Sequence, residues 1–291
     1  MKGICHLCDN SKERAESHVI PSFVYKWIKK SSGSGYLRAG LNPNRRVQDG
    51  NKYYWLCGDC EGLFSKWENR FAKELFHPMV KGEVGKVSYD DWLLKFCVSV
   101  SWRVLHLYLV EHNLKHYSDQ MKDNAKQTHQ IWREFLIGAR PHPDYCEQHF
   151  LPFGVIQNHT IDEMPTNINR YILRSVDFDA VAGERSAFIY SKLERFVIIG
   201  FIKAPNSRQW GGTKVHVKHG VVGPRNYEIP IEFNNYFMGK ARGTSVAYAA
   251  ISRKQNKKIE KAFRENIDDN LNSEDVRLFG GMALKKPGKY K

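Results

Sequence analysis

Two pairs of cysteines have the spacing of a metal site. Cys5 and Cys8 form one Cys-x-x-Cys pair, and Cys57 and Cys60 form a second. Each pair lets two sulfurs converge on one ion, and four thiolates complete the tetrahedral shell of structural zinc. The alternative is four small buried side chains without a metal. A closed four-sulfur shell leaves no position for a substrate, so zinc at this site implies no reaction by itself.

The chain between and after these pairs carries groups that can act on a substrate. His18 begins the stretch His-Val-Ile-Pro, and its imidazole can serve as a general base or simply bond a loop carbonyl. After Cys60 the spacing predicts an amphipathic helix with Glu61 and Glu68 on its polar face. Its apolar stripe consists of Phe64, Trp67, Phe71 and Leu75.

The two glutamates, seven residues apart, can share a hard divalent ion with His18, and His77 closes the helix at its C-terminal end. The alternative is purely structural. Glu61 would then favour the helix dipole, Glu68 would be solvated and His77 would cap the last turn.

Residues from about 4 to 78 resemble the four-cysteine form of the HNH, or ββα-metal, endonuclease superfamily. The matching features are the first cysteine pair, His18-x-x-Pro21, a loop through Asn51, and a second cysteine pair that opens a helix. The resemblance implies that His18 is the general base, that Asn51 orients it by hydrogen bonding, and that Glu61 occupies the metal-ligand position. Ser17 stands where the family commonly has Asp or Glu.

Metal-assisted hydrolysis of a phosphodiester bond is the reaction that this resemblance implies. A structural Zn²⁺ and a catalytic Mg²⁺ or Mn²⁺ are the expected ions. A carboxylate at position 61 suits such a hard ion.

The charge of the chain indicates a polyanionic partner. Its 291 residues carry a net charge of +14, and residues 201–264 hold 13 basic against 3 acidic side chains. We expect contacts to nucleic-acid phosphates, DNA more than RNA, from a basic helix and from a turn-rich basic stretch. The predicted contact residues are Arg45, Arg46, Arg253, Lys254, Lys257, Lys258 and Lys261. The alternative is a solvated basic surface.

The predicted architecture is α+β: a zinc-stapled ββα-metal-like head, a helical middle and a mixed, β-rich C-terminal half. Helices are expected near 89–113, 121–138 and 249–266, and strands within 170–181, 186–204, 213–222 and 227–233. These elements suggest a zinc-bound HNH-like domain at 1–80, a helical segment at 81–145 and a basic α+β C-terminal domain at 146–291.

The composition also indicates the cellular compartment of the protein. A polar N-terminus, no expected membrane span and cysteines in metal-like pairs favour the cytoplasm. The remaining two cysteines, Cys97 and Cys146, are expected to be packing residues.

Three functions remain open at this point. The first is an HNH-like nuclease that serves in defence against phages or mobile elements, with a protein partner or an activating trigger. The second is a non-catalytic zinc-containing nucleic-acid-binding or adaptor protein, which Ser17 favours. The third is an enzyme whose site lies in the β-rich C-terminal half.

Overall fold

The chain forms two compact units in the computed structural model. The structure describes residues 2–265 except 33, 41, 113, 157–163, 166–167, 184–185 and 204–205. The first unit consists of residues 1–21, 50–154 and 176–234, and the second of residues 22–49, 155–175 and 235–291. Each unit is thus built from three separate segments of the chain. The three consecutive domains expected from the sequence stay a prediction.

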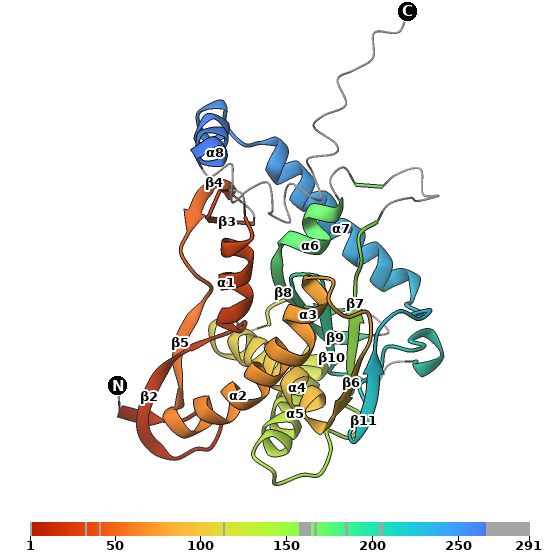
Figure 1. The fold of residues 1–291 in the computed structure, drawn as a ribbon. Coiled ribbons are helices and arrows are strands. Elements are labelled where there is room, and N and C mark those ends of the chain that lie inside the picture. The colour runs from red at the N-terminus through yellow and green to blue at the C-terminus, as the bar shows by residue number, and fades with distance from the viewer. Residues whose placement is uncertain are drawn as a thin grey trace, which may run out of the picture. The chain divides into compact units, whose positions relative to one another are not determined.

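The N-terminal part of the first unit is a small antiparallel sheet followed by a helix. Strands β1 (Lys2–Ile4), β2 (Ser11–His18) and β5 (Lys52–Cys57) form a three-stranded sheet in the order β1-β2-β5. Helix α2 (Gly58–Phe71) follows β5 directly and packs against both β2 and β5 (Figure 1). A π-helical segment, Ala72–Phe76, and α3 (His77–Val80) continue it.

The predicted apolar stripe of α2 faces the interior. Phe64, Phe71 and Leu75 are buried, and Phe71 stacks on Phe96 with 3.9 Å between ring centroids. Acidic Asp59 and Glu61 lie in the first turn, where they complement the helix dipole.

A nearly all-buried helix runs through the first unit. Helix α4 (Asp91–Leu107) begins where the Asp90 side chain accepts a hydrogen bond from the Trp92 amide, and a π-helical segment, Tyr108–His112, extends it. Helix α5 (Asp119–Leu136) packs beside it, capped by Ser118. Both predicted helices, 89–113 and 121–138, are therefore confirmed to within a few residues.

By length and composition, the stretch Asp91–His112 could cross a membrane, but 78% of its most apolar window is buried inside the protein. The expectation that no stretch approaches a membrane span is corrected to that extent. Burial of this kind is typical of the core helix of a globular unit.

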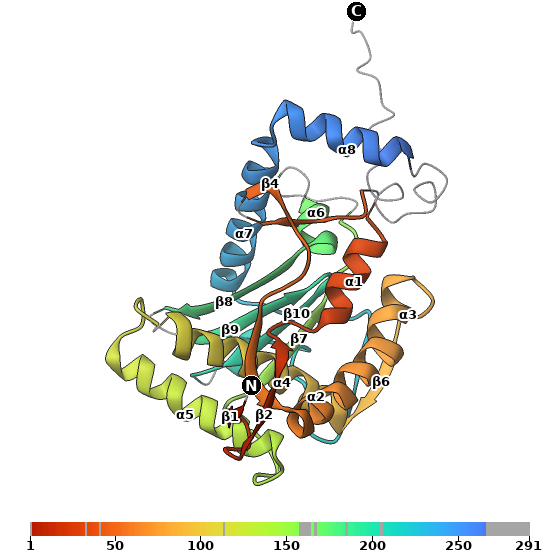
Figure 2. The same ribbon diagram turned by 90° about the vertical axis from the view of Figure 1, so that its left-hand side faces the viewer.

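A four-stranded antiparallel sheet covers α4. Its order is β7 (Gln148–Pro152), β10 (Phe196–Phe201), β9 (Ala187–Leu193) and β8 (Val176–Ala182). Helix α4 contacts all four strands and separates them from α5 (Figure 2). Every residue of β9 and β10 is buried, which explains the continuous apolar pattern that predicted strands within 186–204.

A smaller antiparallel pair joins β6 (Val87–Asp90) to β11 (His219–Val222). Strand β11 lies within the predicted range 213–222, and most of β8 lies within 170–181. The α+β fold class is confirmed, with the four-cysteine group near the N-terminus.

Two of the predicted strand ranges are partly helical. Residues Ile168–Arg174 form α6 before β8 begins, and the range 227–233 contains no described strand and ends in α7 (Ile231–Ala249). The reason is visible in α7: Phe233, Phe237 and Ala241 are buried four residues apart, which is helical spacing. The predicted helix 249–266 corresponds to α8 (Arg253–Glu265).

The second unit is mostly helical and is held by arginine contacts. It contains α1 (Ser22–Lys30), the hairpin β3 (Leu37–Ala39) with β4 (Asn42–Val47), α6, α8 and most of α7. Arg174 of α6 donates to the Ile28 carbonyl at 2.9 Å and to Ser31 Oγ at 2.6 Å. Its neighbour Arg170 lies over the ring of Tyr248 at 4.4 Å.

Candidate metal centre and active site

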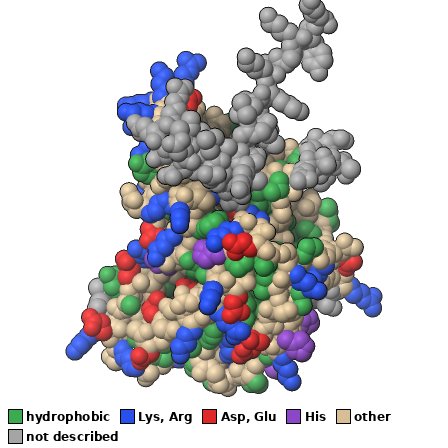
Figure 3. Space-filling view, in the orientation of Figure 1, with side chains coloured by type: hydrophobic (Ala, Val, Ile, Leu, Met, Phe, Trp, Pro, Cys, Tyr) green, Lys and Arg blue, Asp and Glu red, His purple; other side chains and the backbone are tan. Residues whose placement is uncertain are grey.

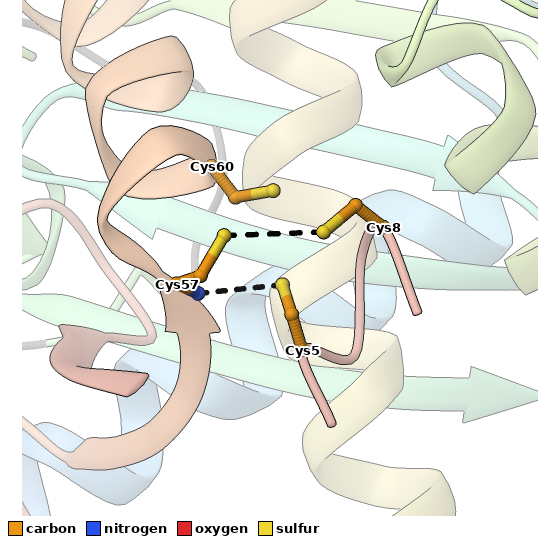
Figure 4. A group of neighbouring side chains, drawn as sticks. All are labelled: Cys5, Cys8, Cys57 and Cys60. Carbon is orange, nitrogen blue, oxygen red and sulfur yellow. Dashed lines mark hydrogen bonds between the residues drawn. The ribbon is translucent and has the colours of Figure 1, made fainter. Parts of the chain in front are cut away.

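The four cysteines of the two pairs meet at one point. Cys5 and Cys8 lie on the turn after β1, Cys57 ends β5, and Cys60 lies in the first turn of α2 (Figure 4). All four sulfurs lie within 4.8 Å of one another, and the Cys8 and Cys57 sulfurs are 3.9 Å apart. Tetrahedral zinc with bonds of about 2.3 Å places its sulfurs about 3.8 Å apart, so the group can hold such a metal.

The surroundings of these sulfurs favour a bound dication. Burial raises the pKa of Cys60 strongly, with the neighbouring Cys5 sulfur adding to the effect, and burial also raises the pKa of Cys8. Burial acts the same way on Cys5, but amide N–H groups of Cys8 and Cys57 outweigh it and lower its pKa to about 7. Four thiolates held this close together repel one another and lose their hydration. A bound metal cation would offset that electrostatic cost.

A chain of three histidines lies behind the first cysteine pair. His6 Nδ1 is 2.6 Å from His106 Nε2, and His106 Nδ1 is 3.1 Å from His129 Nε2. Arg14 Nη1, which can only donate, lies 3.2 Å from His6 Nε2. His6 therefore carries its proton on Nδ1 and donates to His106, which in turn donates to His129.

The histidine chain requires neutral rings. Burial lowers the pKa of His106 to about 3 and that of His129 to about 4. Trp102 stacks on both rings, with centroids 5.0 Å from each. The chain thus links the turn that carries Cys5 and Cys8 to α4 and α5 by directional bonds.

The register of β2 and β5 decides which part of α2 lies near His18. Arg14 pairs with Cys57, and His18 pairs with Lys52, five residues before Cys57. That distance is about 16 Å along a strand. Helix α2 packs against β2 and β5, and about 16 Å along a helix is 11 residues, which leads from Cys57 to Glu68. Glu68 is therefore level with His18, whereas Glu61 is beside the metal centre.

A buried arginine joins His18 and Glu68. Arg103 of α4 donates through Nη1 to the His18 carbonyl at 3.0 Å and pairs with Glu68 Oε1 at 2.7 Å. The side chain of Arg103 is 3% exposed and that of Glu68 is 18% exposed. The predicted alternative of a solvated Glu68 is therefore not what the structure has.

Asn51 contacts the stretch after His18 through its main chain, and its predicted role of orienting the His18 ring stays a prediction. The Asn51 carbonyl accepts the Val19 amide at 3.0 Å. This bond and the one from Arg103 hold the two polar groups of a single peptide unit, the one that joins His18 to Val19.

The remaining predicted ligands lie apart from one another. Glu61 has a buried Oε1 without a hydrogen-bond partner, and the ring of His77 lies 5.2 Å from that of Phe76. Within the described part of the chain, only the four cysteines form a group of three or more Cys, His, Asp or Glu ligand atoms within 4.8 Å. His18, Glu61, Glu68 and His77 do not form a second such cage.

The predicted phosphate contacts come together in the second unit. Asn44 of β4 donates to the Ala250 carbonyl at 3.4 Å and accepts the Ser252 amide at 3.0 Å, so the hairpin contacts the start of α8. All seven predicted residues are exposed, and in Figure 3 basic side chains gather at the upper left, over α8. We call the set Arg45, Arg46, Arg253, Lys254, Lys257, Lys258 and Lys261 the basic surface.

Comparison with known proteins gives no relative of this chain. No protein-family model, curated protein or solved structure matches the chain. The assignment of a four-cysteine group that can hold a metal therefore rests on the placement of the sulfurs in the structure.

Sequence reasoning missed Arg103, His106 and His129. Two of these carry a signal, because Arg103 and His106 interrupt the apolar run Trp102–Leu107. A charged or titratable residue in a buried helix needs a partner, but the partner's identity depends on contacts far along the chain.

The metal centre predicts one bound zinc per chain. Cys60→Ser should lose the zinc and lower the melting temperature by roughly 10 °C or more, because structural zinc contributes folding energy directly. Metal analysis and thermal unfolding by circular dichroism measure both. Cys97→Ala removes an equally buried thiol outside the group and should keep the zinc. Equal zinc content in the two variants would contradict the assignment.

The histidine chain predicts a loss of stability in acid. The folded-state pKa of His129 lies below its unfolded value of about 6.5, so unfolding takes up a proton as pH falls from 6.5 toward 4. In wild type, the free energy of unfolding should therefore fall more steeply over this range than in His129→Gln, by up to about 1.4 kcal/mol per pH unit.

Urea unfolding of both proteins at several pH values between 7.5 and 4.5 tests this slope. His142→Gln changes an exposed histidine and should leave the wild-type slope unchanged. Parallel curves for wild type and His129→Gln would show that His129 is not held neutral by the fold.

Proposed function

We propose that the protein is a metal-dependent endonuclease of the HNH type that hydrolyses phosphodiester bonds in nucleic acid. The observation that carries the proposal is the β2–β5–α2 arrangement, in which the strand register brings His18 level with Glu68. The four-cysteine group beside it ties the strands to the helix. This arrangement agrees with the resemblance of residues 4–78 to the superfamily.

In this proposal His18 takes a proton from the attacking water. It is half-buried at the end of β2, and its peptide is held by Arg103 and Asn51. A general base needs this kind of fixed orientation toward the proton that it removes.

A hard divalent ion such as Mg²⁺ or Mn²⁺ would be held by Glu68 or Glu61. When bound, it would stabilise negative charge on the scissile phosphate and on the leaving oxygen. The buried, unpartnered Oε1 of Glu61 and the carboxylate of Glu68 are suitable donors. Mg²⁺ commonly uses one or two carboxylates and completes its shell with waters and substrate phosphate, so it does not require a cage of four protein ligands.

We assign nucleic-acid binding to the second unit, and within it to the basic surface. By sequence this unit holds 21 basic and 9 acidic residues, a net +12, whereas the first unit holds 24 and 22, a net +2. Nearly all of the chain's +14 therefore belongs to one unit. Charge of one sign concentrated in this way attracts a polyanion, and double-stranded DNA is the partner that we favour.

The resemblance and the reduced cysteines complete the proposal. Six cysteines without disulfides suit the cytoplasm, and we assign the protein to defence against phages or mobile elements, with a partner or trigger that would turn on cleavage.

A second candidate is a zinc-containing nucleic-acid-binding or adaptor protein without catalysis. Two observations favour it: Glu68 is already paired with Arg103, and Ser17, next to His18, is fully buried and offers no carboxylate. The third possibility, an enzymatic site in the β-rich half, stays a prediction; among the described residues of that half, His149 lies in hydrogen-bond range of Glu147 and of Thr213.

Cleavage distinguishes the two candidates. Purified protein with Mg²⁺ or Mn²⁺ should nick supercoiled plasmid, and His18→Ala should reduce the rate at least about 100-fold while keeping its zinc, because a general base typically contributes this much. His219→Ala changes an exposed histidine on β11 and should cleave as wild type does. Cleavage that survives His18→Ala would move the site elsewhere.

The basic surface predicts salt-dependent binding. Replacing the five basic residues of α8 in this surface by Gln should weaken binding to duplex DNA. It should also reduce the slope of log K against log[salt] by up to about 4.5, because each phosphate that the protein neutralises adds about 0.9 to that slope. Fluorescence anisotropy between 50 and 300 mM salt measures the slope.

The matched control removes the same charge from the first unit. It replaces five exposed lysines there by Gln, namely Lys66, Lys73, Lys86, Lys115 and Lys126. This variant should keep most of the slope. If the slope falls equally in both variants, binding follows total charge and not the basic surface.

A further inference from the structure

We propose that Arg103 is a positioning residue, which fixes the imidazole of His18 relative to α2 by holding the His18 carbonyl and the Glu68 carboxylate together. Its kinetic consequence rests on the proposed nuclease function, but the positioning itself does not.

The contacts of Arg103 reach three elements. Nη1 bonds the His18 carbonyl at the end of β2 at 3.0 Å and Glu68 Oε1 on α2 at 2.7 Å. Nε bonds the Ser99 carbonyl one turn earlier in α4 at 3.2 Å, and the guanidinium carbon lies 5.2 Å from the ring centroid of Phe64. The guanidinium is therefore held in its own helix, against α2 and against β2.

Burying the Arg103 guanidinium costs desolvation free energy, so its presence in the core calls for a specific role. Its neighbours in α4, Trp102 and Val104, are fully buried apolar side chains, and an apolar residue of similar volume would pack there without a desolvation penalty. Replacing a buried ion pair by apolar residues is often neutral or stabilising. Overall stability alone therefore does not account for Arg103, whereas the directional bond to the His18 carbonyl is something that no apolar side chain can supply.

The bond acts on the peptide that sets the direction of His18. The His18 carbonyl is held by Arg103, and the N–H of the same peptide unit is held by the Asn51 carbonyl at 3.0 Å. With both polar groups fixed, that peptide plane is fixed. Removing the Arg103 bond would take away the restraint on the carbonyl side of this peptide, and with it the link that Arg103 makes between the end of β2 and Glu68 of α2.

A second arginine in the same unit supplies a matched control. Arg133 of α5 donates to the Leu7 carbonyl at 2.6 Å and pairs with the Asp9 carboxylate. It thus bridges a carbonyl and a carboxylate as Arg103 does, but it touches neither His18 nor α2 in these contacts. Arg133→Met removes a comparable bridge elsewhere.

The experiment compares the His18 ring signal in Arg103→Met, Arg103→Lys, Glu68→Gln and Arg133→Met. Proteins carry ¹³C,¹⁵N-labelled histidine, His18→Gln identifies the His18 ring signal, and zinc content is measured in each. We expect the His18 ring signal to shift in Arg103→Met and to stay in place in Arg133→Met. Arg103→Lys should give a smaller shift, because a lysine ammonium keeps the charge but not the fork of an arginine.

Glu68→Gln keeps Arg103 and an amide acceptor, so it should also shift the His18 signal less than Arg103→Met. If Arg103→Met does not fold, the lysine variant decides, since it retains the buried cation. An unchanged His18 signal in the folded Arg103 variants would overturn the proposal.

Cleavage gives an independent readout. Arg103→Met should lower kcat by about 10- to 100-fold with KM for DNA changed less than about 3-fold, because a misplaced group loses transition-state alignment and not substrate binding. Arg133→Met should keep the wild-type kcat. If His18→Ala cleaves normally, His18 is not the general base and the site lies elsewhere, while the His18 signal in the Arg103 variants still decides whether Arg103 positions its ring.

Discussion

The convergence of four sulfurs is the constraint on which the candidate site depends. Cys57 is the last residue of β5 and Cys60 lies in the first turn of α2, so a metal bound to both fixes where the strand ends and how the helix is rotated as it begins. Cys5 and Cys8 tie the same point to the turn before β2. A closed metal shell at these four sulfurs would set the strand register and the phase of α2 together, although it could not itself bind a substrate.

The distance between the metal centre and His18 follows from that register. A strand advances about twice as far per residue as a helix. Five residues of β5 therefore correspond to about eleven of α2, and the carboxylate that Arg103 joins to the end of β2 is that of Glu68. The resemblance points to Glu61, next to Cys60, and only the strand pairing indicates Glu68 as the neighbour of His18.

Local patterns were sufficient for much of the fold. The cysteine pairs, the helices over 89–113 and 121–138 and the strands within 186–204 all follow from spacing and apolar runs. The pattern failed at α7, where Asn234, Asn235, Gly239 and Gly243 dilute the helical signal and packing overrides propensity. Arg103 could not be assigned a role, because its partners lie 85 and 35 residues away in sequence.

The polar residues of α4 explain how an almost wholly apolar helix positions a site. Apolar contacts hold α4 in the core but have little directional preference, whereas each polar side chain specifies one partner. Ser101 Oγ bonds Gln148 Oε1 of β7 at 2.8 Å, where the absence of a side chain at Gly200 leaves the room. Arg103 bonds β2 and α2, and His106 bonds the turn of the first cysteine pair.

These three residues of α4 therefore bond to three different places: the four-stranded sheet, the candidate active site and the turn of the first cysteine pair. Sliding or rotating α4 would break all of these bonds at once and would leave buried polar groups unpaired, at a cost of about 1–3 kcal/mol for each. The buried polar groups of α4 thus define the placement of the strand–strand–helix part on the rest of the first unit. A reaction that depends on the orientation of His18 would need the strand–strand–helix part to be placed in this fixed way. Apolar packing alone does not fix that placement.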